Sequence, residues 1–222
     1  ICGACSGEVL EEGPLGPEGT FRHGVASGDP LVDRVILWTR VTAPGRAFLP
    51  VHWEIATDEA FRERVGAGWS IAREENDFTV KVDAAGLRPG RRYWYRFHCL
   101  GRTSDAGRTR TLPVGRVERA RFALCSCSAS DSGRFAGYRL LAERDDLEAV
   151  LHVGDYIYEY GPAPGARSRV VDPPHECLTL EDYRRRYACH RLDEELQLAH
   201  RTHPFVVIWD DHEIATDAFR DG

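Results

Sequence analysis

The chain has 222 residues, of which 42% are hydrophobic and 10% aromatic, so it can bury the core of one large domain or two small ones. Its 29 basic and 35 acidic residues give a net charge of −6, and no basic block is dense enough to follow a nucleic-acid backbone. No apolar run approaches the roughly 20 residues of a membrane span. We therefore expect a soluble chain that binds neither nucleic acid nor the membrane interior.

Residues 1–20 are rich in Gly, Glu and Pro without hydrophobic periodicity, which predicts a mobile leader. Cys2 and Cys5 within it lack the strand and helix that frame a thioredoxin-type redox site, so we interpret them as terminal thiols. Because the chain contains no Met, Ile1 is not a translation start, and we expect a processed or cut chain.

Short strands and turns fill residues 21–116. Strand-like patterns cover 35–41, 51–55 and 78–82, and residues 87–97 combine a turn with aromatic side chains at every second position. This last stretch predicts a tyrosine corner, in which Tyr93 or Tyr95 hydrogen-bonds back across the corner of a β-sandwich. The segment resembles a fibronectin type III or immunoglobulin-like sandwich, and we interpret its aromatic residues as core.

From residue 117 onward the pattern changes to strands that alternate with helices. Two strands joined by a helical crossover form a parallel pair. An approximate capping box of Thr179 and Asp182 starts the second helix. We predict an α/β layer that abuts the sandwich. Its predicted elements are strand 121–125, helix 137–148, strand 148–153, a loop at 161–174, helix 179–199 and strand 205–209.

Each predicted strand of this layer runs directly into side chains that can bind a metal. In open α/β sheets ligands bind at the carboxyl ends of the strands, so these side chains should meet at one rim. Each group alone is more typical of turns and helix caps, but their convergence favours a site. The groups are Cys125, Ser126 and Cys127; then Gly154, Asp155, Tyr156, Ile157, Tyr158 and Glu159; and then Asp210, Asp211, His212 and Glu213.

The chemistry of these side chains favours a pair of cations that act on phosphate. Asp155 and Asp211 supply hard oxygen ligands, and two ions about 3.5 to 4 Å apart can activate water for an in-line displacement. Cys127 is a softer ligand. Tyr158 would bind only as phenolate beside a strong Lewis acid, which suits ferric iron better than zinc. His212 could donate a proton or hydrogen bond to a substrate oxygen.

Two of these motifs, residues 154–160 and 209–213, closely resemble those of the PhoD-like alkaline phosphatase and phosphodiesterase family, within the calcineurin-like metallophosphoesterase superfamily. Residues 21–30 resemble the opening of the family's amino-terminal sandwich, and residues 182–187 also match. The resemblance implies an N-terminal all-β fibronectin III/Ig-like sandwich at 21–116, followed at 117–222 by the first half of an α/β metallophosphoesterase domain.

The same resemblance implies a site that holds Fe³⁺ and Ca²⁺ and hydrolyses phosphate monoesters and diesters outside the cytoplasm. Cys127, Asp155 and Tyr158 would bind the iron, with Asp155 as the bridge. Asp211 would bind the second metal, and His212 would be the catalytic imidazole. We expect a monomer that acts on phosphate esters.

Other residues of these motifs have less definite implied roles. Asp210 and Glu213 belong to the family motif and are expected to lie behind the ligands. Cys125 precedes Cys127 by two on a strand, which leaves open a register in which Cys125 binds instead. His190 stands where an aromatic residue is expected, so the resemblance leaves substrate contacts there open.

Four candidate ligands cannot fill the roughly ten to fourteen coordination places of two such ions. We therefore interpret the chain as the amino-terminal portion of a longer enzyme, with an open sheet prone to association. One alternative is a non-catalytic secreted binding module with solvated acidic loops. A zinc site held by thiols ranks last, because the cysteines lack regular ligand spacing.

Overall fold

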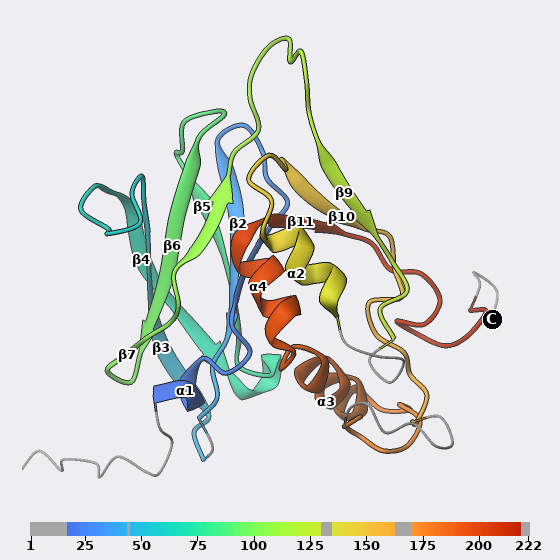
Figure 1. Cartoon of the computed structure of the whole chain (residues 1–222). Helices are drawn as coiled ribbons and strands as arrows, with labels where there is room; N and C mark the ends of the chain where they lie inside the picture. The colour runs from blue at the N-terminus through green and yellow to red at the C-terminus, as the bar shows by residue number, and fades with distance from the viewer. Residues whose placement is uncertain (1–16, 44, 130–134, 163–169, 219–222) are drawn as a thin grey trace, which may run out of the picture.

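Two β-sheets form the body of the molecule, which a computed structural model describes over residues 17–43, 45–129, 135–162 and 170–218 (Figure 1). The first sheet is antiparallel. All of its neighbouring strands pair antiparallel, including β3 with β6, which are not consecutive in the chain. Its strands are β3 (Phe48–Ala56), β4 (Arg64–Arg73), β6 (Arg92–Cys99), β7 (Arg102–Thr103) and β8 (Gly107–Arg110).

The second sheet is mixed and has the order β5-β2-β1-β11-β10-β9. Its antiparallel part comes from the first half of the chain and its parallel part mainly from the second half. The two parts join where Ser27 pairs with Pro204 and Gly28 with Phe205. The α/β layer therefore extends one sheet of the sandwich rather than abutting it. The strands are β1 (Val25–Gly28), β2 (Arg34–Arg40), β5 (Thr79–Ala85), β9 (Phe122–Cys125), β10 (Ala149–His152) and β11 (Pro204–Val207).

The main hydrophobic core lies between the two sheets, because alternate residues of each strand face inward. Leu37 of β2, Val51 of β3 and Tyr95 of β6 belong to this core and are fully buried. The predicted tyrosine corner is confirmed at Tyr93, whose hydroxyl accepts from Arg88 N at 2.8 Å and donates to Arg88 O at 3.2 Å. Tyr93, Tyr95 and Phe97 are core, as predicted, whereas Trp94 is only half-buried and Trp69 and Phe48 are exposed.

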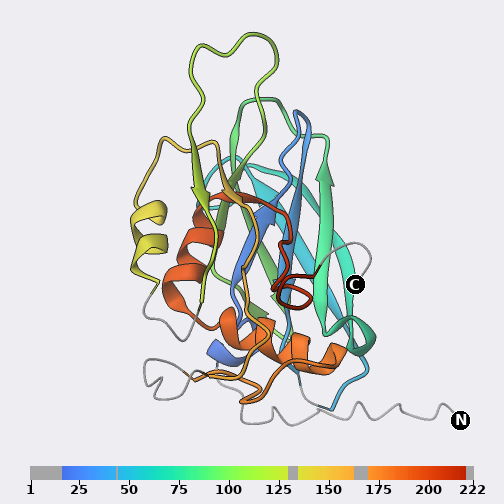
Figure 2. The ribbon, with the colours of Figure 1, turned by 90° about the vertical axis from the view of Figure 1, so that its right-hand side faces the viewer.

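Helices cover one face of the parallel strands. Figure 2 shows α2 (Ala136–Ala142) and α4 (Glu194–Thr202) on the same side of β9, β10 and β11. A second core forms there from Val150, Phe205, Tyr138 and Leu196, among others. The predicted parallel pairing of the strands at 121–125 and 148–153 is confirmed by the register of β9 and β10. Two further short elements are α1 (Pro17–Thr20) and η1 (Glu74–Asn76).

The prediction of one helix over 179–199 is wrong. The structure has two helices there, α3 (Leu180–His190) and α4. They are separate because Asp193 is the N-cap residue of α4, and its side chain accepts a hydrogen bond from Leu196 N at 2.7 Å. The start of α3 follows the prediction. Thr179 and Asp182 form a complete capping box, in which each side chain accepts from the other residue's backbone N–H.

Other element boundaries also differ from those predicted. The helix expected over 137–148 ends at Ala142, and the strand expected over 205–209 ends at Val207. Strand β4 was not predicted, because its Gly66 and Gly68 break the apolar alternation where they pack under a tryptophan ring. Within the predicted leader, residues 17–20 form α1, whereas Cys2 and Cys5 lie outside the described residues. No helix in the described ranges is both long and apolar enough to span a bilayer.

Charged side chains of the sandwich bind the turn between α2 and β10. Arg108 Nη1 contacts Asp145 Oδ1 at 2.7 Å, and Arg92 donates to the backbone carbonyl of Asp145. Arg110 pairs with Glu148 at 2.9 Å. These contacts, together with the shared sheet, hold the two halves of the chain against each other.

The face of the parallel strands opposite α2 and α4 carries exposed apolar side chains. The register aligns Leu124 with Leu151 and Leu151 with Val206, so the three side chains lie on one face. Leu124 on the edge strand β9 is 70% exposed. The predicted open, apolar face of this layer is therefore present, although β1 closes one of the two edges.

Candidate metal centre

The loops that follow β9, β10 and β11 lie together at one edge of the sheet, because the three strands are parallel. Pairing continues past the strands: Cys127 N donates to Gly154 O at 3.2 Å, and Ser128 N donates to Asp155 O at 2.8 Å. We call residues 153–162 the Asp155 loop and residues 208–218 the His212 loop. The predicted ligands Asp155, Tyr158, Asp211 and His212 lie on these two loops, and the remaining one, Cys127, follows β9.

Asp155 lies at the centre of the predicted ligands. Its Oδ2 accepts from the Cys127 thiol at 3.3 Å and from the Tyr158 hydroxyl at 3.2 Å. Its Oδ1 is buried and has no hydrogen-bond partner among the described residues. A buried carboxylate oxygen without a partner is costly in free energy, so this atom fits a position that binds a cation.

Asp211 and His212 approach Asp155 from the His212 loop. In the described part of the chain, ligand atoms of Asp155, Asp211 and His212 all lie within 4.8 Å of one another. Carboxylate oxygens suit hard cations, and the neighbouring Cys127 thiol and Tyr158 phenol suit a stronger Lewis acid. The residues present therefore fit a metal centre with two kinds of ligand.

The imidazole of His212 is held by the Asp155 loop. Its Nδ1 is 2.9 Å from Glu159 Oε2, and its ring centroid lies 4.2 Å from that of Tyr158 and 5.4 Å from that of Tyr160. The other oxygen of the buried Glu159 accepts from the backbone N–H and hydroxyl of Thr216 at 2.7 and 2.8 Å. Because Glu159 occupies Nδ1, Nε2 is the ring nitrogen left to face a bound substrate.

The charges of these loops shift the pKa values within the site. Burial, with the adjacent Asp155 carboxylate and Cys127, raises the pKa of Tyr158, so the phenol stays protonated and donates to Asp155. Burial acts to lower the pKa of His212, but the hydrogen bond and charge of Glu159 outweigh it and raise the pKa. The backbone N–H of Asp217 lowers the pKa of Asp211. A cation would reverse the effect on Tyr158.

Left-handed backbone conformations place two of the predicted ligands. Cys127 has φ +57° and Asp155 has φ +53°, which are costly for residues with a Cβ. Gly154 has φ +101°, and a Cβ at this position would lie 2.4 Å from Asp210 Cβ and 2.5 Å from Asp210 N. Only glycine therefore fits between the two loops at this point.

Glu213 connects the two loops through the backbone. Its buried carboxylate accepts from Asp155 N at 3.1 Å, from Asp210 N at 2.8 Å and from Tyr156 N. It thereby supports the strained conformation of Asp155 from behind, as its place in the motif led us to expect. Asp210 itself is exposed, and the group of mutually close ligand atoms does not include it.

Two residues with open roles lie away from this group. The Cys125 thiol donates to Leu151 O at 3.7 Å and packs against the core under α2 and α4. The expected strand alternation to Cys127 fails, because β9 ends at Cys125 and Cys127 adopts a positive φ. His190 is buried, with its ring centroid 5.0 Å from that of Phe135 and 4.8 Å from that of Tyr156.

Sequence reasoning placed Glu159 among the groups that could bind a metal without predicting its contact with His212, and it gave no role to Tyr160 or Thr216. The only sequence signal for Glu159 was its place in the predicted metal-binding group, because its burial and its need for a partner become visible only in the structure. Thr216 carried none, because its contact depends on the turn that follows Asp211.

Comparison with known proteins matches almost the whole chain to one family. The model for the N-terminal domain of PhoD-like phosphatases matches residues 9–113, and the model for PhoD-like phosphatase matches residues 122–222. The chain belongs to the PhoD-like phosphatase family. The predicted family resemblance is therefore confirmed.

Two relatives show how much of this PhoD-like chain is similar to known proteins, and how much of their length it covers. Alkaline phosphatase D of Bacillus subtilis (strain 168) is 42% identical over 207 residues, which cover 87% of this chain and 35% of the relative. A solved structure described as PhoD is 40% identical with a TM-score of 0.84, over 90% of this chain and 40% of that one. The chain thus spans about a third of the length of the curated relative it matches.

Proposed function

We propose that a protein containing this chain hydrolyses phosphate monoesters and phosphodiesters at a metal centre built on the Asp155 and His212 loops. The observation that carries the proposal is the buried Asp155, whose Oδ1 has no partner among the described residues and one of whose carboxylate oxygens lies within 4.8 Å of ligand atoms of Asp211 and His212. The similarity to alkaline phosphatase D supports the same reaction class.

We propose that Cys127, Asp155 and Tyr158 hold Fe³⁺, that Asp211 holds Ca²⁺, and that Asp155 lies between the two ions. The donor set supports this division, since thiolate and phenolate favour the stronger Lewis acid and carboxylates suit calcium. When bound, such ions lower the pKa of a coordinated water and neutralise charge on the phosphate.

His212 is the proposed catalytic residue. Glu159 fixes the proton on Nδ1 and orients the ring, so Nε2 can donate to a phosphate oxygen or to the departing alcohol. The raised pKa of His212 favours the protonated, donating form. Tyr158 and Tyr160 flank the ring and restrict its rotation.

Activity of the full-length protein on p-nitrophenyl phosphate and on bis(p-nitrophenyl) phosphate tests the proposal. Asp155→Asn and Asp211→Asn should each lower kcat/KM by at least about 100-fold, because each removes a charge that would hold a cation. Asp83→Asn on β5 is a matched control, since its carboxylate pairs with Arg34 on the sandwich. Unchanged turnover in both site variants would instead favour the non-catalytic binding module.

Metal analysis tests the identity of the ions separately from the reaction. The purified full-length protein should contain iron and calcium and show a visible charge-transfer band from tyrosinate to iron. Tyr158→Phe should remove the band while Tyr160→Phe keeps it. Iron-free protein with full activity would overturn the proposed iron site.

We further propose that residues 21–116 are a fibronectin III/Ig-like domain and that residues 117–222 are the first half of a metallophosphoesterase domain. The tyrosine corner at Tyr93 supports the first assignment. From the family resemblance we also propose a monomer that acts outside the cytoplasm. Cell fractionation with compartment markers, and light scattering of the purified protein, test these two points.

A further inference from the structure

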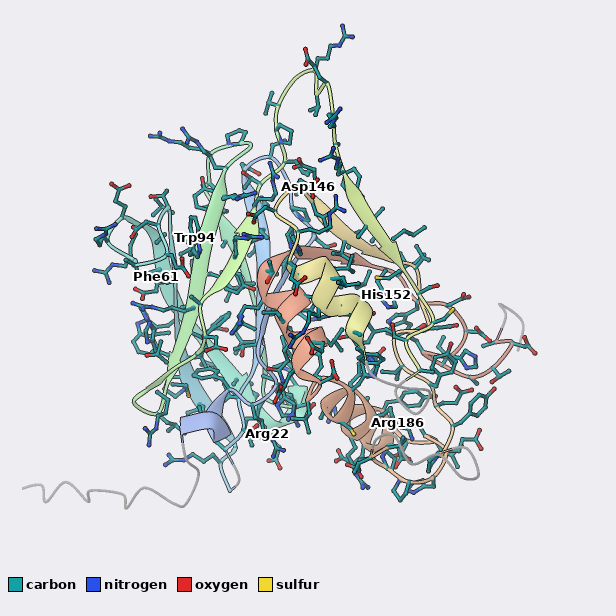
Figure 3. The ribbon with its side chains drawn as sticks, in the orientation of Figure 1. Arg22, Phe61, Trp94, Asp146, His152 and Arg186 are labelled. Carbon is teal, nitrogen blue, oxygen red and sulfur yellow. The ribbon has the colours of Figure 1, made fainter. Side chains whose placement is uncertain are left out.

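Helix α3 contacts both loops of the candidate metal centre, although it carries none of the predicted ligands. It contains the motif Asp182-Tyr183-Arg184-Arg185-Arg186-Tyr187, to which the reaction assigns no role. Figure 3 labels Arg186 on this helix, beside the loops that follow the parallel strands. Tyr183, Arg186 and Tyr187 lie three and four positions apart and therefore share one face of the helix.

Arg186 binds the backbone of the Asp155 loop. Its buried guanidinium donates to the carbonyl of Tyr158 and to that of Tyr160, the latter at 2.6 Å. The same group donates to the carbonyls of Asp172, Pro173 and His175 at 3.3, 2.8 and 3.1 Å. A planar, always charged guanidinium with five donors suits such a ring of carbonyls, which an ammonium group cannot match.

The Glu159 carbonyl, which lies between those of Tyr158 and Tyr160, is held by the segment that precedes α3. Cys177 N donates to Glu159 O at 2.8 Å. Three consecutive carbonyls of the Asp155 loop, at residues 158, 159 and 160, are therefore fixed by α3 or the segment that precedes it. The side chains on these residues are the ones that contact Asp155 and His212.

The same helix face reaches the other loop. The Tyr183 hydroxyl donates to the carbonyl of Ile214, two residues after His212. The Tyr187 ring stacks on Tyr156, the neighbour of Asp155, with centroids 6.1 Å apart and ring planes inclined by 20°. The two loops are thus tied to one rigid element by side chains one helical turn apart.

We propose that Tyr183 and Arg186 are positioning residues that set the spacing between the Asp155 loop and the His212 loop, and hence the affinity of the centre for its cations. The proposal rests on the proposed metal centre. A rigid frame of this kind matters because ligand atoms must be held to within a fraction of an ångström for tight binding.

Terbium luminescence tests the proposal, with Tb³⁺ as an oxygen-seeking probe that nearby tyrosines sensitise. Tyr183→Phe removes one hydroxyl and should weaken Tb³⁺ binding about 2- to 10-fold, the effect of one lost hydrogen bond. Arg186→Lys should weaken it by at least about 10-fold, because several carbonyls lose their donor. Arg185→Lys is the matched control, since the neighbouring Arg185 pairs with the Asp172 carboxylate.

Hydrogen–deuterium exchange of the metal-free chain gives a second readout. Tyr183→Phe should speed exchange in residues 208–218 and Arg186→Lys in residues 153–162, with the sandwich amides and the melting temperature of Tyr183→Phe unchanged. Tyr183→Phe keeps the ring in place, so it tests the proposal even where Arg186→Lys does not fold.

The outcomes separate this inference from the proposed function. Tb³⁺ binding that Asp155→Asn does not weaken would overturn the metal centre, and exchange alone would then decide whether α3 fixes the loops. Binding that depends on Asp155 but is unaffected by Tyr183→Phe and Arg186→Lys would overturn the positioning role. Equal losses in the Arg185→Lys control would overturn it as well.

Discussion

Glu159 and His212, from loops that follow different strands, meet through a hydrogen bond of 2.9 Å between Oε2 and Nδ1. The carboxylate is buried, and its second oxygen is occupied by Thr216. The pair therefore holds the imidazole in place, and one of its ring nitrogens lies within 4.8 Å of ligand oxygens of Asp155 and Asp211.

Replacement of Glu159 by Gln should lower the pKa of His212 in the metal-free chain. The amide keeps an oxygen near Nδ1, but the negative charge that favours the protonated ring is lost. NMR titration of the imidazole signals measures the change. Asp210→Asn is the control, because Asp210 is exposed and does not contact the ring. An unchanged pKa in Glu159→Gln would contradict the role given to this contact.

Gly154→Ala should destabilise the chain by at least about 2 kcal/mol, because a Cβ collides with the Asp210 backbone and the φ of +101° is strained. Gly137→Ala on α2 is the matched control. A Cβ there meets no atom within 4 Å, and alanine in a helix gains about 0.5 to 1 kcal/mol over glycine. Urea unfolding of both variants provides the comparison, and equal midpoints would refute the predicted clash.

Acid should weaken the fold through His23. Burial, with the guanidinium groups of Arg40, Arg22 and Arg191, lowers the pKa of His23 to about 3. The unfolded chain takes up this proton near pH 6.5, so the stability from neutral His23 is complete above that pH and is lost as the pH falls toward 3. The loss should be on the order of 3 kcal/mol between about pH 7 and pH 4.

Denaturant unfolding at several pH values checks this assignment to His23. The His23→Gln variant should lose less stability than the wild-type chain over the same pH range, although it starts from a lower value. His52→Gln on β3 is the control, because His52 is only partly buried. A pH dependence in His23→Gln as steep as that of the wild type would assign the effect to other buried histidines.

The 222-residue chain by itself should self-associate through the apolar face around Leu124. Leu124→Glu places a charge on this face and should shift sedimentation toward the monomer. Leu140→Glu is the matched control, because Leu140 is 65% exposed on α2 and Leu124 is 70% exposed on β9. If both variants reduce association equally, the association would arise from nonspecific hydrophobic contacts and not from this face.

Most of the elements can be predicted from local sequence patterns. Alternation predicted β2, β3 and β5, and the turn before Tyr93 predicted the corner, since both signals are short in range. The strand-end rule predicted that Asp155 and Asp211 would meet. One failure was local and another depended on a distant contact. The break at Asp193 is a strong cap inside an otherwise continuous helical pattern, and the parallel pairing of β1 with β11 leaves no local trace.

The candidate site shows the same limit. The ligand types could be inferred from Cys127, Asp155 and Asp211, because the residue type alone determines whether a side chain offers a sulfur or an oxygen ligand. The contacts made by Arg186 and Tyr183 could not, because they are side chain to backbone and depend on how α3 crosses the loops. The left-handed φ of Cys127 and Asp155 was also invisible in the sequence.

The pairing of Ser27 with Pro204 has a consequence for biosynthesis. Strand β1 can pair with β11 only after the residues between Gly28 and Pro204 have been made, so the mixed sheet cannot close while the ribosome is still synthesising them. Contacts this distant in sequence slow folding. Until then Gly28 and its neighbours present an unpaired edge, and the nascent chain is at its most vulnerable to misassembly in that interval.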